Sequence, residues 1–318
     1  MQVNVSRRGL WKEIRRNRVA YAYIAPFYLL FAIFGLFPIV MGLGLSFFKW
    51  YGTGPFVFSG LKNYADLFNT VLFWKSLSNT AIMGIIGNFF NLAGGLVLAY
   101  ILNSKLVKYP NLFKTIYFLP MVTSAVAAAI IFQFLFSLNS GIFNYILQIM
   151  GFERVHWLGG TGKHIKTAVI IMFSWKWIGW NMVIYLAGMQ GISYDIIESA
   201  IVDGASHARI FLRITLPILR PIILFTIIQS TIGSINLFTE PFMLTGGRIM
   251  IGGPANQGLT AMMFLLGKAP YGNNLYGYAS ACAIVLCIII IIVSIFFMNV
   301  MGEREGAVVG NRHRRAAP

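Results

Sequence analysis

Six long apolar stretches, separated by shorter polar segments, follow one another along the chain. They cover about residues 20–48, 79–102, 114–137, 166–188, 218–238 and 278–301. Each is long enough to cross a hydrocarbon core of about 30 Å as an α-helix. The first exceeds the roughly 7 to 15 apolar residues of a secretory signal, so we interpret it as an uncleaved span. The pattern predicts an all-α integral membrane protein with six transmembrane helices.

Composition agrees with a membrane protein and excludes several other classes. The chain has 318 residues, of which 58% are hydrophobic and 11% charged, and its mean hydropathy is +0.73. A soluble domain of this composition is implausible. The net charge of +16 comes from basic residues scattered at the ends of the apolar stretches, which indicates membrane topology rather than binding to nucleic acid.

Six spans place both termini on one side of the membrane, and the basic residues indicate which side. Sixteen Lys and Arg residues fall in the N-terminal tail and in segments 103–114, 189–220 and 302–318, against eight in segments 49–79, 138–167 and 239–277. The first set is therefore expected in the cytoplasm. The predicted organisation is a basic cytoplasmic tail (1–19), a six-helix transmembrane domain (20–301) and a second basic cytoplasmic tail (302–318).

The polar segment 193–217 is expected to form a compact helical projection on the cytoplasmic side. Asp195 favours a helix start, Gly204 permits a left-handed turn, Ser206 can cap a second helix, and Pro217 suits the first turn of a third. Small residues around the turn would let the surface of another protein approach the backbone closely. The segment therefore suits a mechanical contact with a partner.

This segment resembles the EAA loop of permease subunits of bacterial ABC importers. The resemblance is carried by Glu198, Ala200, Asp203, Gly204 and Ala205, followed by Ile214, Leu216 and Pro217, with Ser193 and Ser199 as small departures. In that family the loop is the coupling helix that docks into the ATP-hydrolysing subunit. The resemblance implies that Glu198, Ala200, Asp203, Gly204 and Ala205 contact the ATPase here.

Other landmarks are similar to the carbohydrate-uptake, maltose-type permeases for di- and oligosaccharides. They are the stretch Phe58–Phe68, which could form a surface helix, and the pieces Tyr117–Pro120 and Leu244–Gly247. The resemblance implies a MetI-like fold in a bacterial inner membrane and half of a translocation pore. Its implied partners are a second homologous permease, two ATP-binding cassette subunits, an extracytoplasmic solute-binding protein, the saccharide and membrane lipid. ATP and Mg would be held by the ATPase subunits, and this chain would bind no cofactor.

Two helix faces next to this loop are candidates for a sugar site. Phe173, Lys176, Trp177 and Trp180 share one face of the fourth span, with Trp175 beside them, and Thr226, Ser230, Gly233 and Ser234 share one face of the fifth. Aromatic rings opposite hydroxyls suit a pyranose, which has an apolar face and a polar edge. The alternative is ordinary helix packing or lipid contact, which we prefer for Tyr185 and Gln190. Asn88 and Asn91 could face the pore or a neighbouring helix.

Lys176 is the one charge placed within the apolar core of a span, where lysine costs about 2.5 to 3.5 kcal/mol at the centre. One interpretation is that its side chain reaches water, a carbonyl or an acid on the partner permease. The other is that its ammonium contacts the substrate, which would favour an acidic saccharide such as an oligouronide.

The sequence holds no recognisable enzyme motif. The piece Gly159–His164 partly resembles a phosphate-binding loop, but two positions do not fit. Trp157, two residues before the piece, stands where the loop needs its first Gly, and His164 stands where it needs Ser or Thr. Cys282 and Cys287 point to different helix faces, which supports neither a disulfide nor a metal site. The nine acids lie outside the six apolar cores, with Glu240 at the border of one, so a proton relay is not indicated. An ion-coupled secondary transporter and a non-transporting membrane scaffold remain the alternatives.

The topology can be tested with reporter fusions. Fusions after Lys108, after Ser206 and at the C-terminus should report the cytoplasm, and fusions near Lys62, Gly160 and Asn256 should report the outside, because the basic segments stay inside. A cytoplasmic signal at Gly160 would contradict the six-span arrangement.

Overall fold

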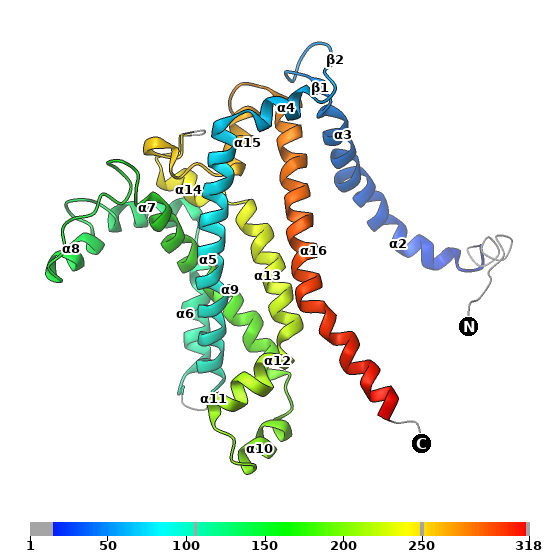
Figure 1. The fold of residues 1–318 in the computed structure, drawn as a ribbon, viewed down its shortest axis with the longest axis vertical. Coiled ribbons are helices and arrows are strands. Elements are labelled where there is room, and N and C mark those ends of the chain that lie inside the picture. The colour runs from blue at the N-terminus through cyan, green and yellow to red at the C-terminus, as the bar shows by residue number, and fades with distance from the viewer. Residues whose placement is uncertain (1–14, 105–106, 249–250, 316–318) are drawn as a thin grey trace.

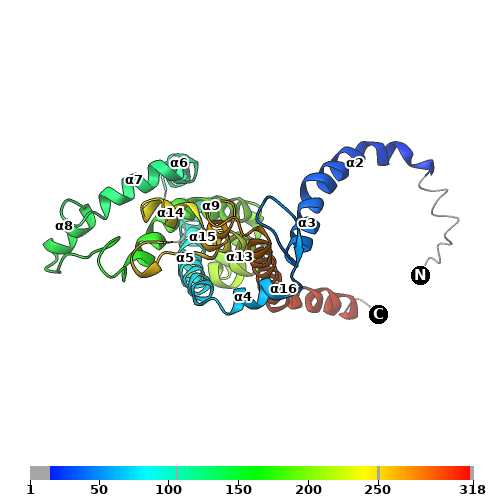
Figure 2. The same ribbon diagram turned by 90° about the horizontal axis from the view of Figure 1, so that it is seen from above.

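The computed structural model describes residues 15–104, 107–248 and 251–315, and it is built almost wholly of helices. Four long helices form the centre of the molecule: α5 (Val71–Asn103), α9 (Ile165–Gln190), α13 (Arg220–Ile235) and α16 (Tyr276–Arg315). They lie together in both views, with α5 and α9 packed along much of their lengths (Figures 1 and 2). The sequence-based expectation of an all-α chain is met.

The remaining elements surround these four. On the N-terminal side they are α2 (Arg18–Phe31), a π-helical turn η1 (Ala32–Leu36), α3 (Phe37–Leu45), the paired strands β1 (Phe48–Lys49) and β2 (Val57–Phe58), and α4 (Lys62–Phe68). Further along are α6 (Pro110–Val122), α7 (Ala125–Leu135), α8 (Ile142–Ile149), α10 (Tyr194–Val202), α11 (His207–Ile210), η2 (Phe211–Thr215), α12 (Leu216–Ile218), α14 (Thr239–Leu244), η3 (Pro254–Asn256) and α15 (Ala261–Lys268). The surface helix expected over Phe58–Phe68 is therefore confined to α4.

By length and composition, four helical segments of the described chain could each cross a membrane. They are Arg18–Leu45, Val71–Asn103, Ile165–Gln190 and Tyr276–Val300. Two bent helix pairs raise the number to six if each pair counts as one span. These segments coincide with the six predicted stretches, although the second begins at Val71 rather than at about residue 79.

The third predicted span, 114–137, is two helices that meet at an angle of 98°. Thr123 and Ser124 between them have extended backbones, with ψ angles of 137° and 130°. Pro120, near the end of α6, has no backbone N–H to offer the carbonyl one turn earlier, which weakens the helix at that point. The chain then turns sideways, and α7 packs against α14.

The fifth predicted span, 218–238, corresponds to α13, which covers Arg220–Ile235. The preceding segment His207–Ile218 is bent by 68° from α13, and Arg220 and Pro221 open the second helix. Residues 236–238 form a turn that leads into α14.

The contact between α5 and α9 depends on glycines. A Cβ on Gly87 would lie 2.8 Å from Cδ1 of Phe173, and one on Gly95 would lie 2.9 Å from Cβ of Asn181. Both distances are shorter than real side chains tolerate. Small residues allow helices to approach closely where lipid supplies no hydrophobic drive for association, so these glycines serve the packing of α5 against α9.

The N-terminal helical segment meets this core only at its end, where α3 packs against α16. It runs away from the central helices on the side of the molecule opposite α8 (Figure 1), and no residue of α2 or α3 is buried. Large apolar side chains cover it on all sides, including Phe27, Phe34 and Ile39. Its surface is therefore suited to lipid or to another apolar protein surface.

Gly179 offers a test of the packing between α6 and α9. A Cβ at this position would overlap the carbonyl group of Tyr117, which is backbone and cannot rotate away. Gly179→Ala should lower the free energy of unfolding by about 1 to 3 kcal/mol, as overpacking does, measured as a lower Tm of the purified protein in detergent. Gly42→Ala is the matched control, because its Cβ would meet nothing within 4 Å. Equal Tm values for both variants would contradict this packing.

Candidate functional site

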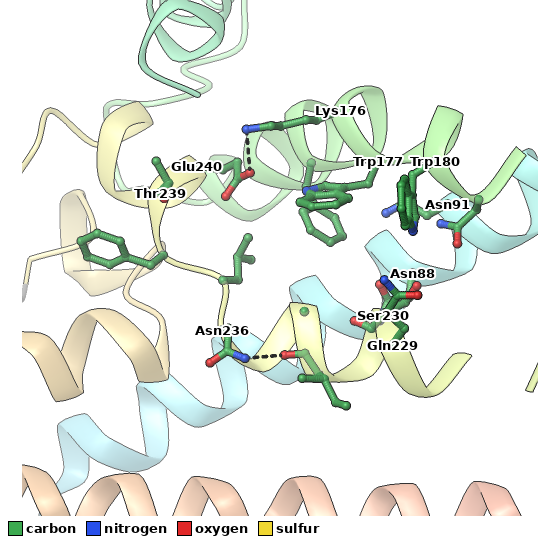
Figure 3. A pocket seen from close by; sticks show the side chains of 16 residues that line it. Asn88, Asn91, Lys176, Trp177, Trp180, Gln229, Ser230, Asn236, Thr239 and Glu240 are labelled. Atoms are coloured by element: carbon green, nitrogen blue, oxygen red, sulfur yellow. Dashed lines mark hydrogen bonds and ion pairs between the residues drawn. The ribbon is translucent and has the colours of Figure 1, made fainter. Parts of the chain in front are cut away.

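A cavity of about 480 Å³ lies between α9 and α13, with α5 behind it and α14 at one end. Sixteen side chains line it: Asn88, Asn91, Phe173, Lys176, Trp177, Trp180, Asn181, Gln229, Ser230, Ile232, Gly233, Asn236, Leu237, Phe238, Thr239 and Glu240. Figure 3 shows Lys176 and Glu240 at one end, and Trp180, Asn91 and Asn88 at the other. The cavity brings together parts of both helix faces that the sequence singled out.

One wall of the cavity is aromatic. Phe173, Trp177 and Trp180 line it from α9, at the one-turn spacings that place residues on one helix face. The rings of Phe173 and Trp177 lie 6.4 Å apart between centroids and are tilted by 46°. Trp175 does not belong to this wall. It is 38% exposed and packs edge-on against Phe132 of α7, because two residues along a helix turn the side chain by about 200°.

The opposite wall comes from α13, and only part of the predicted face of this helix belongs to it. Ser230 and Gly233 line the cavity, whereas Thr226 and Ser234 do not. The Thr226 hydroxyl is 2.7 Å from the hydroxyl of Tyr185 in a buried contact, and Ser234 packs where Gly84 leaves room on α5. These two residues join helices, and Tyr185 has the structural role that its position suggested.

Polar groups from α5 complete the cavity. Nδ2 of Asn88 donates to the backbone carbonyl of Ser230 at 3.1 Å, but its Oδ1 has no hydrogen-bond partner. Oδ1 of Asn91 and Nε1 of Trp180 are buried and unpaired as well. Buried polar atoms are nearly always hydrogen-bonded, so these three atoms, on residues that line the cavity, require a partner that the chain itself does not supply. The sequence left Asn88 and Asn91 open between pore and packing, and the structure places both on the cavity.

Lys176 has an acidic partner on its own chain. Its Nζ lies 3.6 Å from Oε1 of Glu240, and the two side chains are 11% and 8% exposed. An acid on a partner permease is thus not needed to compensate the lysine. Removing one member of such a buried pair typically costs about 3 to 5 kcal/mol, because the other charge is left without a counter-ion. Glu240 was placed at the border of an apolar stretch, and the turn before α14 carries it inward.

The segment 193–217 has the predicted shape. Helix α10 ends in a left-handed Gly204 with φ +76°, whose N–H bonds to the carbonyl of Ile201, while that of Ala205 bonds to the carbonyl of Ala200. This pair of bonds is the Schellman ending of a helix. Ser206 then caps α11 by accepting from the N–H of Arg209, and Pro217 stands in the first turn of α12.

The engaging residues expected in this segment are accessible. Glu198, Asp203 and Gly204 are exposed, and Ala200 and Ala205 are half-buried. Helix α10 projects at the end of the molecule farthest from β1 and β2 (Figure 1). The segment is also connected to the walls of the cavity. Helix α9 precedes it, α13 follows it, and both helices line the cavity.

The part of the chain that the structure describes offers little to a metal ion. No group of three or more His, Cys, Asp or Glu residues there could hold one. Cys282 is buried, Cys287 is exposed, and both are free thiols.

Comparisons with known proteins agree on one family. The family described as "Binding-protein-dependent transport system inner membrane component" matches residues 91–304. The lactose transport system permease protein LacF of Rhizobium radiobacter is 36% identical over 286 residues, which cover 89% of this chain and 93% of that protein. The arabinooligosaccharides transport system permease protein AraP of Bacillus subtilis is 34% identical over 301 residues, 93% of either chain.

Solved structures show the same fold. A chain of the bacterial alginate ABC transporter, crystallised with an alginate pentasaccharide-bound periplasmic protein, matches with a TM-score of 0.77 and 25% identity, over 91% of this chain and 96% of that one. A second structure, of an ABC transporter that imports the acidic polysaccharide alginate, gives a TM-score of 0.74 at 24% identity, over 92% of this chain and 98% of that one. The MetI-like membrane fold expected from the sequence is confirmed, and the chain belongs to the inner-membrane permease components of bacterial binding-protein-dependent ABC transport systems.

Proposed function

We propose that this chain is a permease subunit of an ATP-driven importer for di- or oligosaccharides and forms half of its translocation pore. The observation that carries the proposal is the cavity between α9 and α13, which aromatic residues line together with uncharged polar side chains such as those of Asn88, Asn91 and Ser230. A sugar ring presents an apolar face to aromatic side chains and hydroxyls to amides, so it can satisfy both walls at once.

The names of the relatives support a saccharide as substrate. They include permeases for lactose, for arabinooligosaccharides and for trehalose or maltose, and the alginate importer has the same fold. A neutral and an acidic saccharide are both compatible with this architecture. The cavity contacts that we assign to the substrate are Phe173, Trp177, Trp180, Ser230 and Gly233, joined by Asn88 and Asn91.

Because this chain would form only half of the pore, the importer needs further subunits. A second homologous permease would complete it, an extracytoplasmic solute-binding protein would deliver the saccharide, and two ATP-binding cassette subunits would hold ATP and Mg. This chain would have no ATPase site and no cofactor of its own. The segment 193–217 would face the cytoplasm, where exposed Glu198, Asp203 and Gly204 would contact one ATPase.

The two other functions fit less well. An ion-coupled carrier would need a carboxylate that can take up and release a proton, and Glu240, the buried acid beside the cavity, is paired with Lys176. A scaffold that moves nothing would not need unpaired polar atoms around a cavity. Uptake that depends on a sodium or proton gradient without an ATPase would favour the carrier.

The turn at Gly204 gives a test of coupling. Proline cannot adopt φ +76° and lacks the N–H that bonds to Ile201, so Gly204→Pro should abolish ATPase-dependent sugar uptake or co-purification of the ATPase. Glu198→Ala would remove one charged hydrogen bond of the proposed contact with the ATPase, about 1.5 to 3 kcal/mol, and should be milder. Gly204→Asn is the control, because Asn tolerates a left-handed backbone. A fully active proline variant would show that this corner is not the contact.

The aromatic wall can be tested with two tryptophans of the same helix. Trp177→Ala removes a ring from the cavity and should raise the KM for sugar uptake by about 2- to 10-fold, the loss expected for one aromatic contact. Trp175→Ala is the matched control, because that ring lies outside the cavity and should leave KM unchanged. Similar KM values for both variants in proteoliposomes would remove the cavity from the transport path.

A further inference from the structure

The charges that line the cavity are a single ion pair. Of its sixteen lining residues, Lys176 and Glu240 are the two that carry a charge, and the two lie 3.6 Å apart. Both are nearly buried, so water screens them little. The lining of this described cavity therefore carries one positive and one negative charge in contact, and its net charge is zero.

An acidic saccharide is poorly accommodated next to such a pair. If its carboxylate displaced Glu240 from Lys176, the carboxylate of Glu240 would be left buried without a counter-ion, which is strongly unfavourable. If both carboxylates shared the lysine, the cavity would hold two negative charges against one positive charge in a medium of low dielectric constant. Lys176 was a candidate receptor for an acid only as long as its ammonium was unpaired.

Uncharged hydroxyls can use the same pair without breaking it. The ammonium has three donors and a carboxylate about four acceptor positions, so each keeps hydrogen-bonding capacity beyond the contact between them. The other polar residues of the lining are neutral as well, among them Asn88, Asn91 and Ser230. Hydroxyl groups, which both donate and accept, complement this whole set.

We propose that the Lys176–Glu240 ion pair leaves this chain's side of the pore without net charge and thereby favours an uncharged saccharide, with Glu240 as the residue that sets this preference. The inference rests on the proposed function, because it takes the cavity to be the saccharide site. It goes beyond it by naming the charge class of the substrate and a specificity-determining residue on α14.

The first test identifies the transported compound. The solute-binding protein that stimulates the ATPase activity of the reconstituted complex is purified, and the compound it retains is identified by mass spectrometry. A saccharide without carboxylate, sulfonate or phosphate groups supports the inference. A charged saccharide overturns it, whereas a compound that is not a saccharide at all overturns the proposed function.

The second test measures the charge of the cavity. Quenching of tryptophan fluorescence by iodide, divided by quenching by neutral acrylamide, is compared in complexes that carry Glu240→Gln, Lys176→Met/Glu240→Gln or the exposed control Glu153→Gln. Glu240→Gln leaves the lysine unpaired beside Trp177, so the ratio should rise for the part of the fluorescence that comes from this residue, and the double variant should return to the wild-type value. Partial unfolding would raise both kinds of quenching. An unchanged ratio in Glu240→Gln overturns the inference.

Uptake by the same complexes connects charge with transport. Glu240→Gln should reduce uptake of the identified saccharide by at least about tenfold, because it leaves a buried charge unpaired. The double variant removes that charge and should recover uptake to within about a few-fold of the Glu153→Gln control. Wild-type uptake by Glu240→Gln, or a double variant no better than the single one, overturns the role of Glu240.

Discussion

The close contact between α5 and α9 is the constraint on which the rest of this structure depends. Helices in a membrane are not driven together by hydrophobic burial, since lipid is as apolar as their side chains. They associate where small residues let backbones approach and where polar groups can pair. On α5, glycines at positions 87 and 95 accept Phe173 and Asn181 of α9. This register places Asn88 and Asn91 of α5 beside the aromatic residues of α9.

The position of α5 also brings polar side chains to the cavity. Nδ2 of Asn88 donates to the backbone carbonyl of Ser230 and so connects α5 to α13. Oδ1 of Asn88, Oδ1 of Asn91 and Nε1 of Trp180 have no hydrogen-bond partner. Packing alone would have been served better by apolar side chains. Unsatisfied buried groups lower stability, and they are understandable where a ligand completes them.

The cavity and the exposed corner at Gly204 are parts of one continuous piece of chain. Helix α9 enters the corner and α13 leaves it, and both line the cavity. In the proposed transport cycle, a partner that moves the corner would therefore act on both walls of the cavity. Shifting a two-state gate from 1:99 to 99:1 takes about 5.5 kcal/mol of differential binding. The bend of 68° before α13 leaves a place at which the corner and the wall could change their relative angle.

Much of the architecture could be read from the sequence, because the relevant signals are local. Six apolar stretches are long enough for helices in lipid, and the order of Gly204, Ser206 and Pro217 specifies a helix ending, a cap and a helix start within a few residues. Helical periodicity also placed Phe173, Trp177 and Trp180 on one face. Each of these predictions concerns residues within a few helical turns of one another.

The tertiary structure decided which way these faces point and what meets them. Periodicity gives the angle between side chains on one helix but not the orientation of that helix toward its neighbours. Trp175, Thr226 and Ser234 were therefore grouped with the site, although the first packs on α7 and the other two join helices. The partner of Lys176 was likewise out of reach of the sequence alone. Glu240 reaches it only because the chain turns back between α13 and α14, and such a contact depends on the packing of the whole chain.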